Sequence, residues 1–258
     1  YLSREQYRGL QKHFENIELR KIMEDQMFLD CFGCDIDYSL GKNFADFADQ
    51  FSKDSRYRTE LYKLRRKFMS HADGLIHADL HTSNIMASRD KMKVIDMEFA
   101  FMGPFGYDLG YLVGNLISQY CAACFKRFPS EQNRKQFKAY LLATIKSLIE
   151  TYMKTFTLCW EKSVKERYRG QQGLLQSILQ EVMEDVPGYA SMVNWFRSVS
   201  EIPYPDFDII EDKDAKRNAT VLSLMIDWGI MFGRYKYQSA DDLIETIIGI
   251  EEEFRKSL

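Results

Sequence analysis

Residues 74–100 read GLIHADLHTSNIMASRDKMKVIDMEFA. Three short runs in this stretch, GLIHA, NIMAS and KVIDM, are rich in β-branched and apolar residues and predict β-strands. The last two runs flank the polar turn Arg89-Asp90-Lys91 and therefore predict a β-hairpin. On both sides of the stretch, apolar residues recur at the spacing of amphipathic helices. The sequence thus predicts an α+β fold that is predominantly α, with a small hairpin in its first half.

Helix start signals frame much of the remaining chain. Ser3 followed by Gln6, and Ser239 followed by Asp242, have the spacing of a capping box. Ser130 directly after a proline predicts the start of a long helix. Residues 201–208, EIPYPDFD, contain two prolines and predict a break. Helices are expected over residues 4–14, 17–28, 54–73, 115–125, 131–167, 174–186, 189–199, 215–232 and 239–258.

The composition is that of an ordinary globular protein. Of the 258 residues, 45% are hydrophobic and 28% are charged, which excludes a wholly disordered or collagen-like chain. The net charge of −3 provides no general attraction for nucleic acid or an anionic membrane. Even the apolar stretch from Val221 to Gly233 contains Asp227, so no run reaches the roughly 18 apolar residues of a membrane span. We expect no nucleic-acid or membrane partner, and a homodimer is left open.

The five cysteines predict a reducing compartment. Their number is odd and small for the length, so we expect no disulfide framework and a cytoplasmic location. Cys31 with Cys34, and Cys121 with Cys124, form C-x-x-C pairs whose four thiolates suit zinc. The second pair lies in an apolar, helix-like stretch, so we favour small core residues. The chain starts at Tyr1 without a signal-peptide core, and we expect it to be cut rather than targeted.

Four polar side chains surround the hairpin in an order that suits phosphoryl transfer. Asp79 follows the first strand, Asn84 begins the hairpin, and Asp96 and Glu98 end it. Because a hairpin brings its two ends together, we expect Asn84 beside Asp96, with Asp79 close by. Carboxylate and amide oxygens suit Mg²⁺, which keeps other positions for phosphate oxygens and water. A carboxylate at Asp79 can accept the proton of an attacking hydroxyl.

The spacing from Asp79 to Asn84 matches that of protein kinases, whose catalytic Asp and metal-binding Asn stand five residues apart. A single Asp in a surface loop is more often a solvated turn residue. Clustered carboxylates, however, are unfavourable unless a cation offsets them. The joint pattern therefore predicts an enzyme that uses Mg²⁺ and ATP, with Asp79 as the base and Asn84 and Asp96 at the metal.

Residues 77–86, HADLHTSNIM, and 94–110, VIDMEFAFMGPFGYDLG, resemble the catalytic motifs of aminoglycoside phosphotransferases and choline kinases. Within that superfamily they are most similar to the 5-methylthioribose kinases, and weaker similarity covers most of the chain. The resemblance implies a protein-kinase-like fold and transfer of phosphate from ATP to a sugar hydroxyl, most closely that of 5-methylthioribose. It also implies roles for matching residues: Asp79 as catalytic base, Asp96 and Glu98 as Mg²⁺ ligands, and His77, His81 and Asp108 as structural support for the catalytic loop.

Departures from the family pattern leave the acceptor open. Ala78 replaces a glycine, which narrows the backbone conformations available to the loop. Asn84 replaces the serine usual in 5-methylthioribose kinases, and Met97 replaces a proline. Arg197 corresponds to an arginine that contacts the thioribose, whereas Phe196 stands where a further arginine is expected. We therefore expect Phe196 and Arg197 at the substrate, with a different sugar or alcohol as an alternative acceptor.

Signals for the remaining half of a nucleotide site are missing from this sequence. No Gly-rich phosphate loop and no lysine-bearing strand precede the first helices. We interpret residues 1–258 as the C-terminal lobe of a two-lobed kinase and expect this chain alone to be inactive. Two alternatives remain: a kinase of the superfamily that acts on an aminoglycoside, choline or another alcohol, and a catalytically inactive kinase-like binding module.

Overall fold

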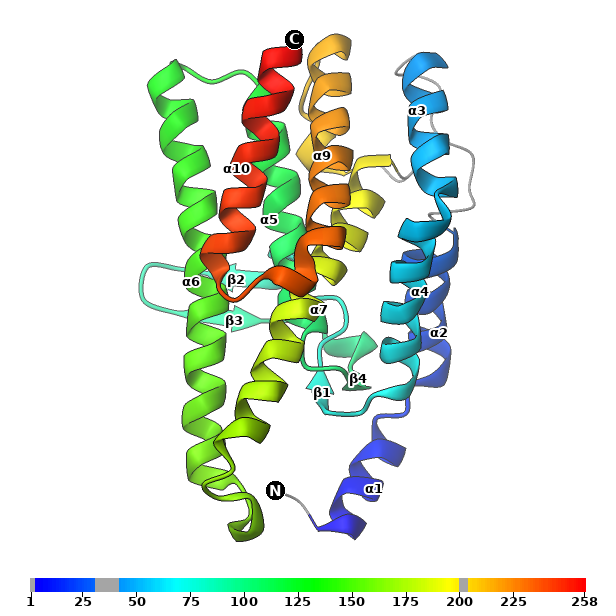
Figure 1. Ribbon diagram of the computed structural model, residues 1–258, viewed down its shortest axis with the longest axis vertical. Coiled ribbons are helices and arrows are strands. Elements are labelled where there is room, and N and C mark those ends of the chain that lie inside the picture. The colour runs from blue at the N-terminus through cyan, green and yellow to red at the C-terminus, as the bar shows by residue number, and fades with distance from the viewer. Residues whose placement is uncertain (1–2, 31–41, 200–203) are drawn as a thin grey trace.

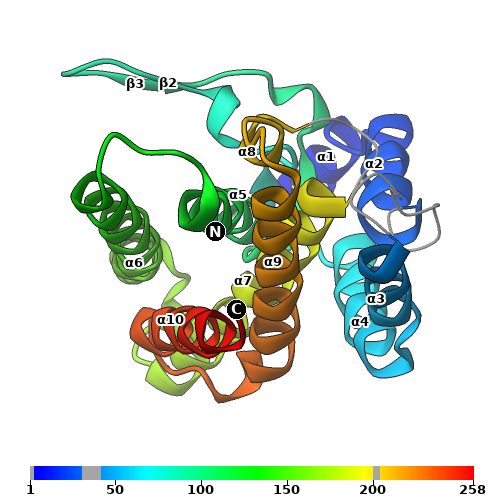
Figure 2. The same cartoon turned by 90° about the horizontal axis from the view of Figure 1, so that it is seen from above.

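Helix α5 (Tyr107–Phe125) runs through the centre of the protein, with other helices around it (Figure 1; Figure 2). The computed structural model describes residues 3–30, 42–199 and 204–258. Helices α6 (Glu131–Ser163), α7 (Gln172–Val199) and α9 (Lys213–Gly233) all pack against α5. Nearly every residue of α5 is buried, so this helix forms the centre of the core. The predominantly α character predicted from the sequence is confirmed.

The other elements lie around this centre. Strands β2 (Ile85–Ala87) and β3 (Met92–Val94) form a hairpin that projects from the helical body (Figure 2). The helices are α1 (Arg4–His13), α2 (Ile17–Glu24), a π-helical turn (Asp25–Leu29), α3 (Lys42–Lys53), α4 (Ser55–Ser70), α8 (Pro205–Asp208) and α10 (Ala240–Ser257). The 3₁₀ turns span Thr82–Asn84, Met97–Phe99, Glu166–Tyr168 and Arg234–Lys236. The strands are β1 (Gly74–Ile76), β2 (Ile85–Ala87), β3 (Met92–Val94) and β4 (Phe101–Gly103).

Close packing of α5 on α7 depends on glycines. Gly106, at the N-cap of α5, is followed at four-residue intervals by Gly110 and Gly114, which therefore lie along one face of the helix. A Cβ atom at Gly110 would lie 2.6 Å from the Cβ of Tyr189, and one at Gly114 would lie 2.5 Å from the Ala190 carbonyl oxygen. Both distances are well inside van der Waals contact. Larger residues would therefore force the two helices apart.

Aromatic side chains join α4 to the strands and to the start of α5. The Phe68 ring on α4 packs against Phe101 of β4, with centroids 4.9 Å apart, and against Tyr107 of α5, with centroids 4.8 Å apart. All three side chains are fully buried. Aromatic pairs at such distances add to the stabilisation from burial. This packing holds β4 and the first turn of α5 in place next to the candidate site.

Helix α7 differs from the sequence prediction of two separate helices over 174–186 and 189–199. It continues through Pro187, which lies inside the helix. A proline removes one backbone hydrogen bond and tends to end or kink a helix. Here almost all residues from Val182 to Phe196 are buried, and burial on several faces outweighs that local preference. The close approach of Tyr189 and Ala190 to α5 belongs to this same segment.

Two antiparallel strand pairs lie on either side of the loop that carries Asp79. Strands β2 and β3 form the predicted hairpin, in which Ile85 pairs with Val94 and Ala87 with Met92. Strand β1 pairs with β4, so that Gly74 faces Gly103. The sequence analysis did not predict β4. Its partner lies almost thirty residues earlier, and local periodicity carries no information about such a distant pairing.

Helix termini agree with the predicted caps. Ser3 and Gln6 form the predicted capping box, and Ser239 forms another with Asp242. The Ser130 side chain accepts a hydrogen bond from the Asn133 N–H at 3.1 Å and starts α6. That helix ends at Ser163, a few residues before the predicted end, and a separate 3₁₀ turn follows.

The predicted cysteine pairs are only partly described. Cys121 and Cys124 are buried free thiols in α5, as the core interpretation predicts. Burial raises the pKa of Cys124 to about 12, which keeps the thiol protonated. Cys31 and Cys34 lie outside the described residues, as does Pro203 of the predicted break. Within the described part of the chain, no helix is long and apolar enough to cross a membrane.

Candidate active site

The backbone after β1 is held by the carboxylate of Asp108, in the first turn of α5. Oδ2 accepts a hydrogen bond from the His77 backbone N–H at 2.6 Å, and Oδ1 accepts one from the Ala78 N–H at 2.9 Å. Burial raises the pKa of Asp108 above its usual value, although the two backbone donors act in the opposite direction. The packing of α5 on α7 therefore also sets the position of the loop that leads to Asp79.

The turn after β1 uses a left-handed backbone conformation at Ala78. This residue has a φ of 68° and is buried. The left-handed region is unfavourable for a residue that carries a Cβ, by about 1–2 kcal/mol, and glycine adopts it without strain. The replacement of glycine by Ala78, noted from the sequence, thus occurs at a position where the backbone conformation is strained. Asp96, at the far end of the hairpin, has a similar φ of 66°.

Two histidines form hydrogen bonds within the loop. The His77 ring donates from Nε2 to the Ile95 carbonyl oxygen at 2.8 Å and accepts at Nδ1 from the Asp79 backbone N–H at 3.3 Å. His77 therefore links the loop to the end of β3. His81 accepts at Nδ1 from the Ser83 N–H at 3.2 Å, while its Nε2 lies 3.4 Å from Oδ2 of Asp79.

The hairpin brings Asn84 to the residue before Asp96. The Ile95 backbone N–H donates to the Asn84 carbonyl oxygen at 3.0 Å, directly beyond the last strand pair. Nδ2 of Asn84 donates to the Asp79 carbonyl oxygen at 3.0 Å and lies 3.4 Å from the Asp79 carboxylate. Asp79 and Asn84 are thus in direct contact, in line with the expectation that the hairpin places them close together, and Asp96 follows the residue bonded to Asn84.

The donor set around the hairpin is compatible with a magnesium ion. Because the amide nitrogen of Asn84 is directed at Asp79, its Oδ1 is the atom available to a cation. Asp96 and Glu98 are exposed, so their carboxylates are accessible from solvent. Over residues 3–30, 42–199 and 204–258, no group of three or more His, Cys, Asp or Glu side chains is arranged to hold a metal. Magnesium commonly takes one or two carboxylates and completes its shell with phosphate and water.

Three further residues at this site were missed by the sequence analysis. The side-chain Oδ1 of Asn115 accepts hydrogen bonds from the backbone N–H and the hydroxyl of Thr82, at 3.2 and 2.6 Å. The Asn16 amide donates to the carbonyl oxygens of Glu98 and Ala100, at 2.7 and 3.2 Å. Burial, together with the charge of Asp79, raises the pKa of Tyr111 well above its usual value. No local motif marks these residues, because each is separated from its partner by about thirty residues or more.

The predicted substrate residues lie on α7, near α8. Phe196 is only 7% exposed and packs against Tyr204, with ring centroids 5.6 Å apart. Arg197 donates from Nε to Oδ2 of Asp206 at 2.7 Å, and its guanidinium lies over the Tyr204 ring. The Gln119 amide also donates to Asp206. Arg197 is therefore already neutralised by a buried carboxylate.

The segment that forms the loop and the hairpin is similar to a family of known proteins. Residues 36–148 match the phosphotransferase enzyme family, and this range contains Asp79, Asn84, Asp96 and Glu98. The similarity to this family therefore includes both the loop and the hairpin of the candidate site. The mostly helical architecture with small two-stranded sheets is consistent with the kinase-like fold of the family.

Methylthioribose kinases are among the similar proteins. The chain is 31% identical to that of Geobacillus thermodenitrificans (strain NG80-2) over 254 residues, which cover 97% of this chain and 61% of the relative. It is 32% identical to that of Geobacillus kaustophilus (strain HTA426), over 93% of this chain and 58% of the relative. The chain therefore spans about three fifths of the length of these relatives.

Proposed function

We propose that this chain carries the phosphoryl-transfer centre of an ATP-dependent small-molecule kinase whose acceptor is a sugar hydroxyl. The observation that carries the proposal is the contact between Asp79 and Asn84 beside the end of the hairpin, where Asp96 and Glu98 follow. Similarity to methylthioribose kinases makes 5-methylthioribose the first acceptor to test. We also propose that residues 1–258 form the C-terminal lobe of this kinase and act in a reducing, cytoplasmic setting.

In this mechanism Asp79 accepts the proton of the acceptor hydroxyl while its oxygen attacks the γ-phosphorus of ATP. The new oxygen–phosphorus bond forms as the bond to the β,γ-bridging oxygen breaks, and ADP leaves. Magnesium, when bound, would neutralise the charge on the phosphate oxygens. Asn84, Asp96 and Glu98 are the residues proposed to hold it. His77, His81 and Asp108 would keep the loop in position through the hydrogen bonds described above.

The acceptor remains the less specific part of the proposal. Phe196 offers an apolar face, and Arg197 is paired with Asp206. This arrangement provides fewer unpaired donors for sugar hydroxyls than two arginines would. For this reason another sugar or alcohol acceptor is the second candidate, after 5-methylthioribose.

An assay of the full-length protein with Mg²⁺ and ATP tests both candidates. ADP release is measured with 5-methylthioribose, choline, an aminoglycoside and simple alcohols, and each product is analysed by ³¹P NMR. We expect a phosphate ester with one of these acceptors. No ester with any of the acceptors, together with no release of ADP, would favour the inactive binding module. Residues 1–258 alone should bind metal weakly and show no turnover.

A further inference from the structure

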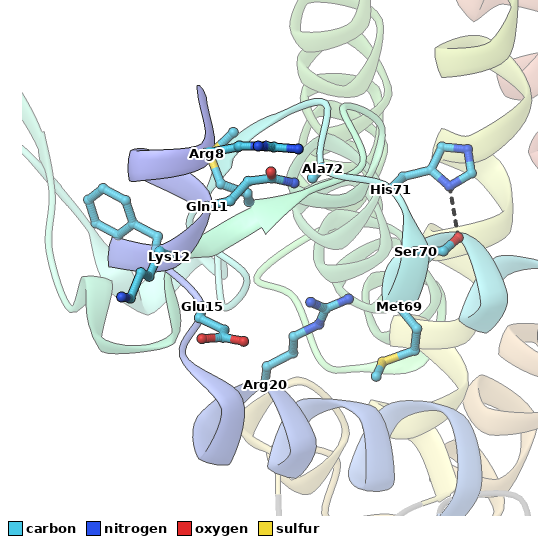
Figure 3. Close-up of a pocket in the computed structure, with 11 residues that line it drawn as sticks. Arg8, Gln11, Lys12, Glu15, Arg20, Met69, Ser70, His71 and Ala72 are labelled. Carbon is cyan, nitrogen blue, oxygen red and sulfur yellow. Dashed lines mark hydrogen bonds between the residues drawn. The ribbon is translucent and has the colours of Figure 1, made fainter. Parts of the chain in front are cut away.

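A separate cavity lies between α1, the end of α4 and strand β4 (Figure 3). Its volume is about 490 Å³, large enough for a small metabolite, and its lining includes none of the candidate active-site residues. Figure 3 shows Arg8 and Gln11 extending from α1 toward the segment at Ala72, and Arg20 extending from α2 toward the same space. This cavity has no role in the proposed phosphoryl transfer.

Positive charge is concentrated around this cavity. Arg8, Lys12 and Arg20 line it, against one carboxylate, that of Glu15. None of the three cations forms an ion pair with another residue in the part of the chain that the structure describes. Many other surface cations of this chain are paired with carboxylates, for example Lys146 with Asp241. An excess of unpaired cations in a protein of net charge −3 indicates a local attraction for anions.

Arg20 has hydrogen-bonding capacity that the protein does not use. Its Nη2 donates to the Phe68 carbonyl oxygen at 2.8 Å, and its guanidinium lies 4.6 Å from the centroid of the Phe101 ring. Its Nε, in contrast, is buried and has no hydrogen-bond partner among the described residues. A buried donor without a partner is unfavourable, and guanidinium groups bind carboxylate and phosphate through paired N–H donors. The bond to Phe68 and the contact with the Phe101 ring thus hold this guanidinium in a fixed position at the cavity wall.

The wall formed by α1 is tied to the body of the protein at both ends. The Tyr7 hydroxyl donates to the Ala72 carbonyl oxygen at 2.6 Å, and Asn16 bonds to the backbone at Glu98 and Ala100. No residue of α1 is buried, so the helix covers the cavity without filling it. Phe14 and Met69 add apolar surface to the lining.

We propose that this cavity binds a small organic anion through a phosphate or carboxylate group. Arg8, Lys12 and Arg20 would surround the anionic group, while Phe14 and Met69 would contact an apolar part of the ligand. The proposal is independent of the phosphoryl-transfer function, because the two sites share no residue.

Calorimetric titration of the full-length protein tests the proposal with phenyl phosphate, inorganic phosphate and benzoate as probes. An Asp79→Asn background saturated with ATP keeps the probes out of the active site. We expect phenyl phosphate or benzoate to bind under these conditions, and the stronger of the two identifies the anionic group. Binding should weaken as ionic strength rises, because the cations are partly exposed. Weaker binding of inorganic phosphate than of phenyl phosphate would support a contribution from the apolar lining.

Substitutions at the exposed cations locate the site. Arg8→Gln and Lys12→Gln should each weaken binding by about two- to fivefold, and the double variant by about tenfold. Lys154→Gln, an exposed lysine on α6, is the matched control and should leave binding unchanged. The proposal is overturned if no probe binds, if ATP abolishes binding, or if the cavity variants behave like Lys154→Gln.

Discussion

The side-chain amide of Asn84 donates to the backbone carbonyl oxygen of Asp79 at 3.0 Å. This bond joins the loop after β1 to the start of the hairpin, five residues later. His77 makes a second connection, from the same loop to Ile95 at the other end of the hairpin. The proposed base and the proposed metal ligands are therefore linked through backbone contacts, and a change in one part of this network should affect the others in measurable ways.

Asp79→Asn should lower kcat of the full-length enzyme by roughly 10²- to 10⁴-fold, the usual effect of losing a general base. The substitution keeps the shape of the side chain but removes the proton acceptor, so affinity for ATP should hardly change. Steady-state kinetics and ATP titration measure the two effects. Asp90→Asn, in the exposed hairpin turn, serves as control and should retain full activity. Near-normal kcat for Asp79→Asn would rule out its role as base.

Ala78→Gly should leave the free energy of unfolding unchanged or raise it by up to about 1 kcal/mol. Glycine relieves the strain of φ 68°, which offsets the greater flexibility of the unfolded chain. Ala100 is a matched control, because it is also buried but has an ordinary φ of −60°. Ala100→Gly should destabilise the protein by about 1 kcal/mol. Equal losses for both variants in urea unfolding would contradict a strained Ala78.

Gly110→Ala should destabilise the protein by about 2 kcal/mol or more. Its new Cβ would meet the Tyr189 Cβ at 2.6 Å and the Val186 carbonyl oxygen at 2.9 Å, so α5 and α7 must separate. Gly249→Ala on α10 is the control, since nothing lies within 4 Å of its added Cβ. That variant should gain up to about 1 kcal/mol from the better helix propensity of alanine. Thermal unfolding separates the two; similar melting temperatures would mean that the helices tolerate the extra atom.

Arg197→Gln should destabilise the protein by about 3 kcal/mol, because it leaves the buried Asp206 carboxylate without its partner. Burial already raises the pKa of Asp206, and Arg197 opposes that rise. Adding Asp206→Asn should recover most of the lost stability, which a double-mutant cycle would reveal. If Arg197 also binds the acceptor, KM for the acceptor will stay high in the stable double variant. A normal KM there would assign Arg197 a purely structural role.

Glu251→Gln should lower stability near pH 7 by about 2 kcal/mol, and this difference should disappear in acid. Burial would raise the pKa of Glu251, but hydrogen bonds from Lys138, Tyr120 and Arg255 outweigh it and lower the pKa to about 2. Because the pKa of Glu251 is lower in the folded than in the unfolded protein, its ionised form stabilises the fold at pH values above the ordinary pKa of 4.5. This stabilisation is lost as the pH falls toward the folded-state pKa of about 2. Unfolding at several pH values measures the change, with the exposed Glu252→Gln as control. A stability difference between Glu251→Gln and the unsubstituted protein that did not change with pH would contradict a lowered pKa of Glu251.

The sequence alone was sufficient for the features that depend on near neighbours. The hairpin follows from two apolar runs around a polar turn, and the closeness of Asp79 to Asn84 follows from their positions just before and at the start of that hairpin. The caps at Ser3, Ser130 and Ser239 follow in the same way. In each case the interacting groups are close in the chain, so the local conformation brings them together without help from the rest of the fold.

The tertiary structure decided the features whose partners are distant in the chain. Strand β4 forms because β1 is beside it, and α7 continues through Pro187 because the surrounding segment is buried. The pairing of Arg197 with Asp206 likewise depends on how the helices are arranged. A local sequence pattern is compatible with many different pairings between strands or side chains that are distant in the chain. Only the packing of the whole core, above all of α5 on α7, selects among them.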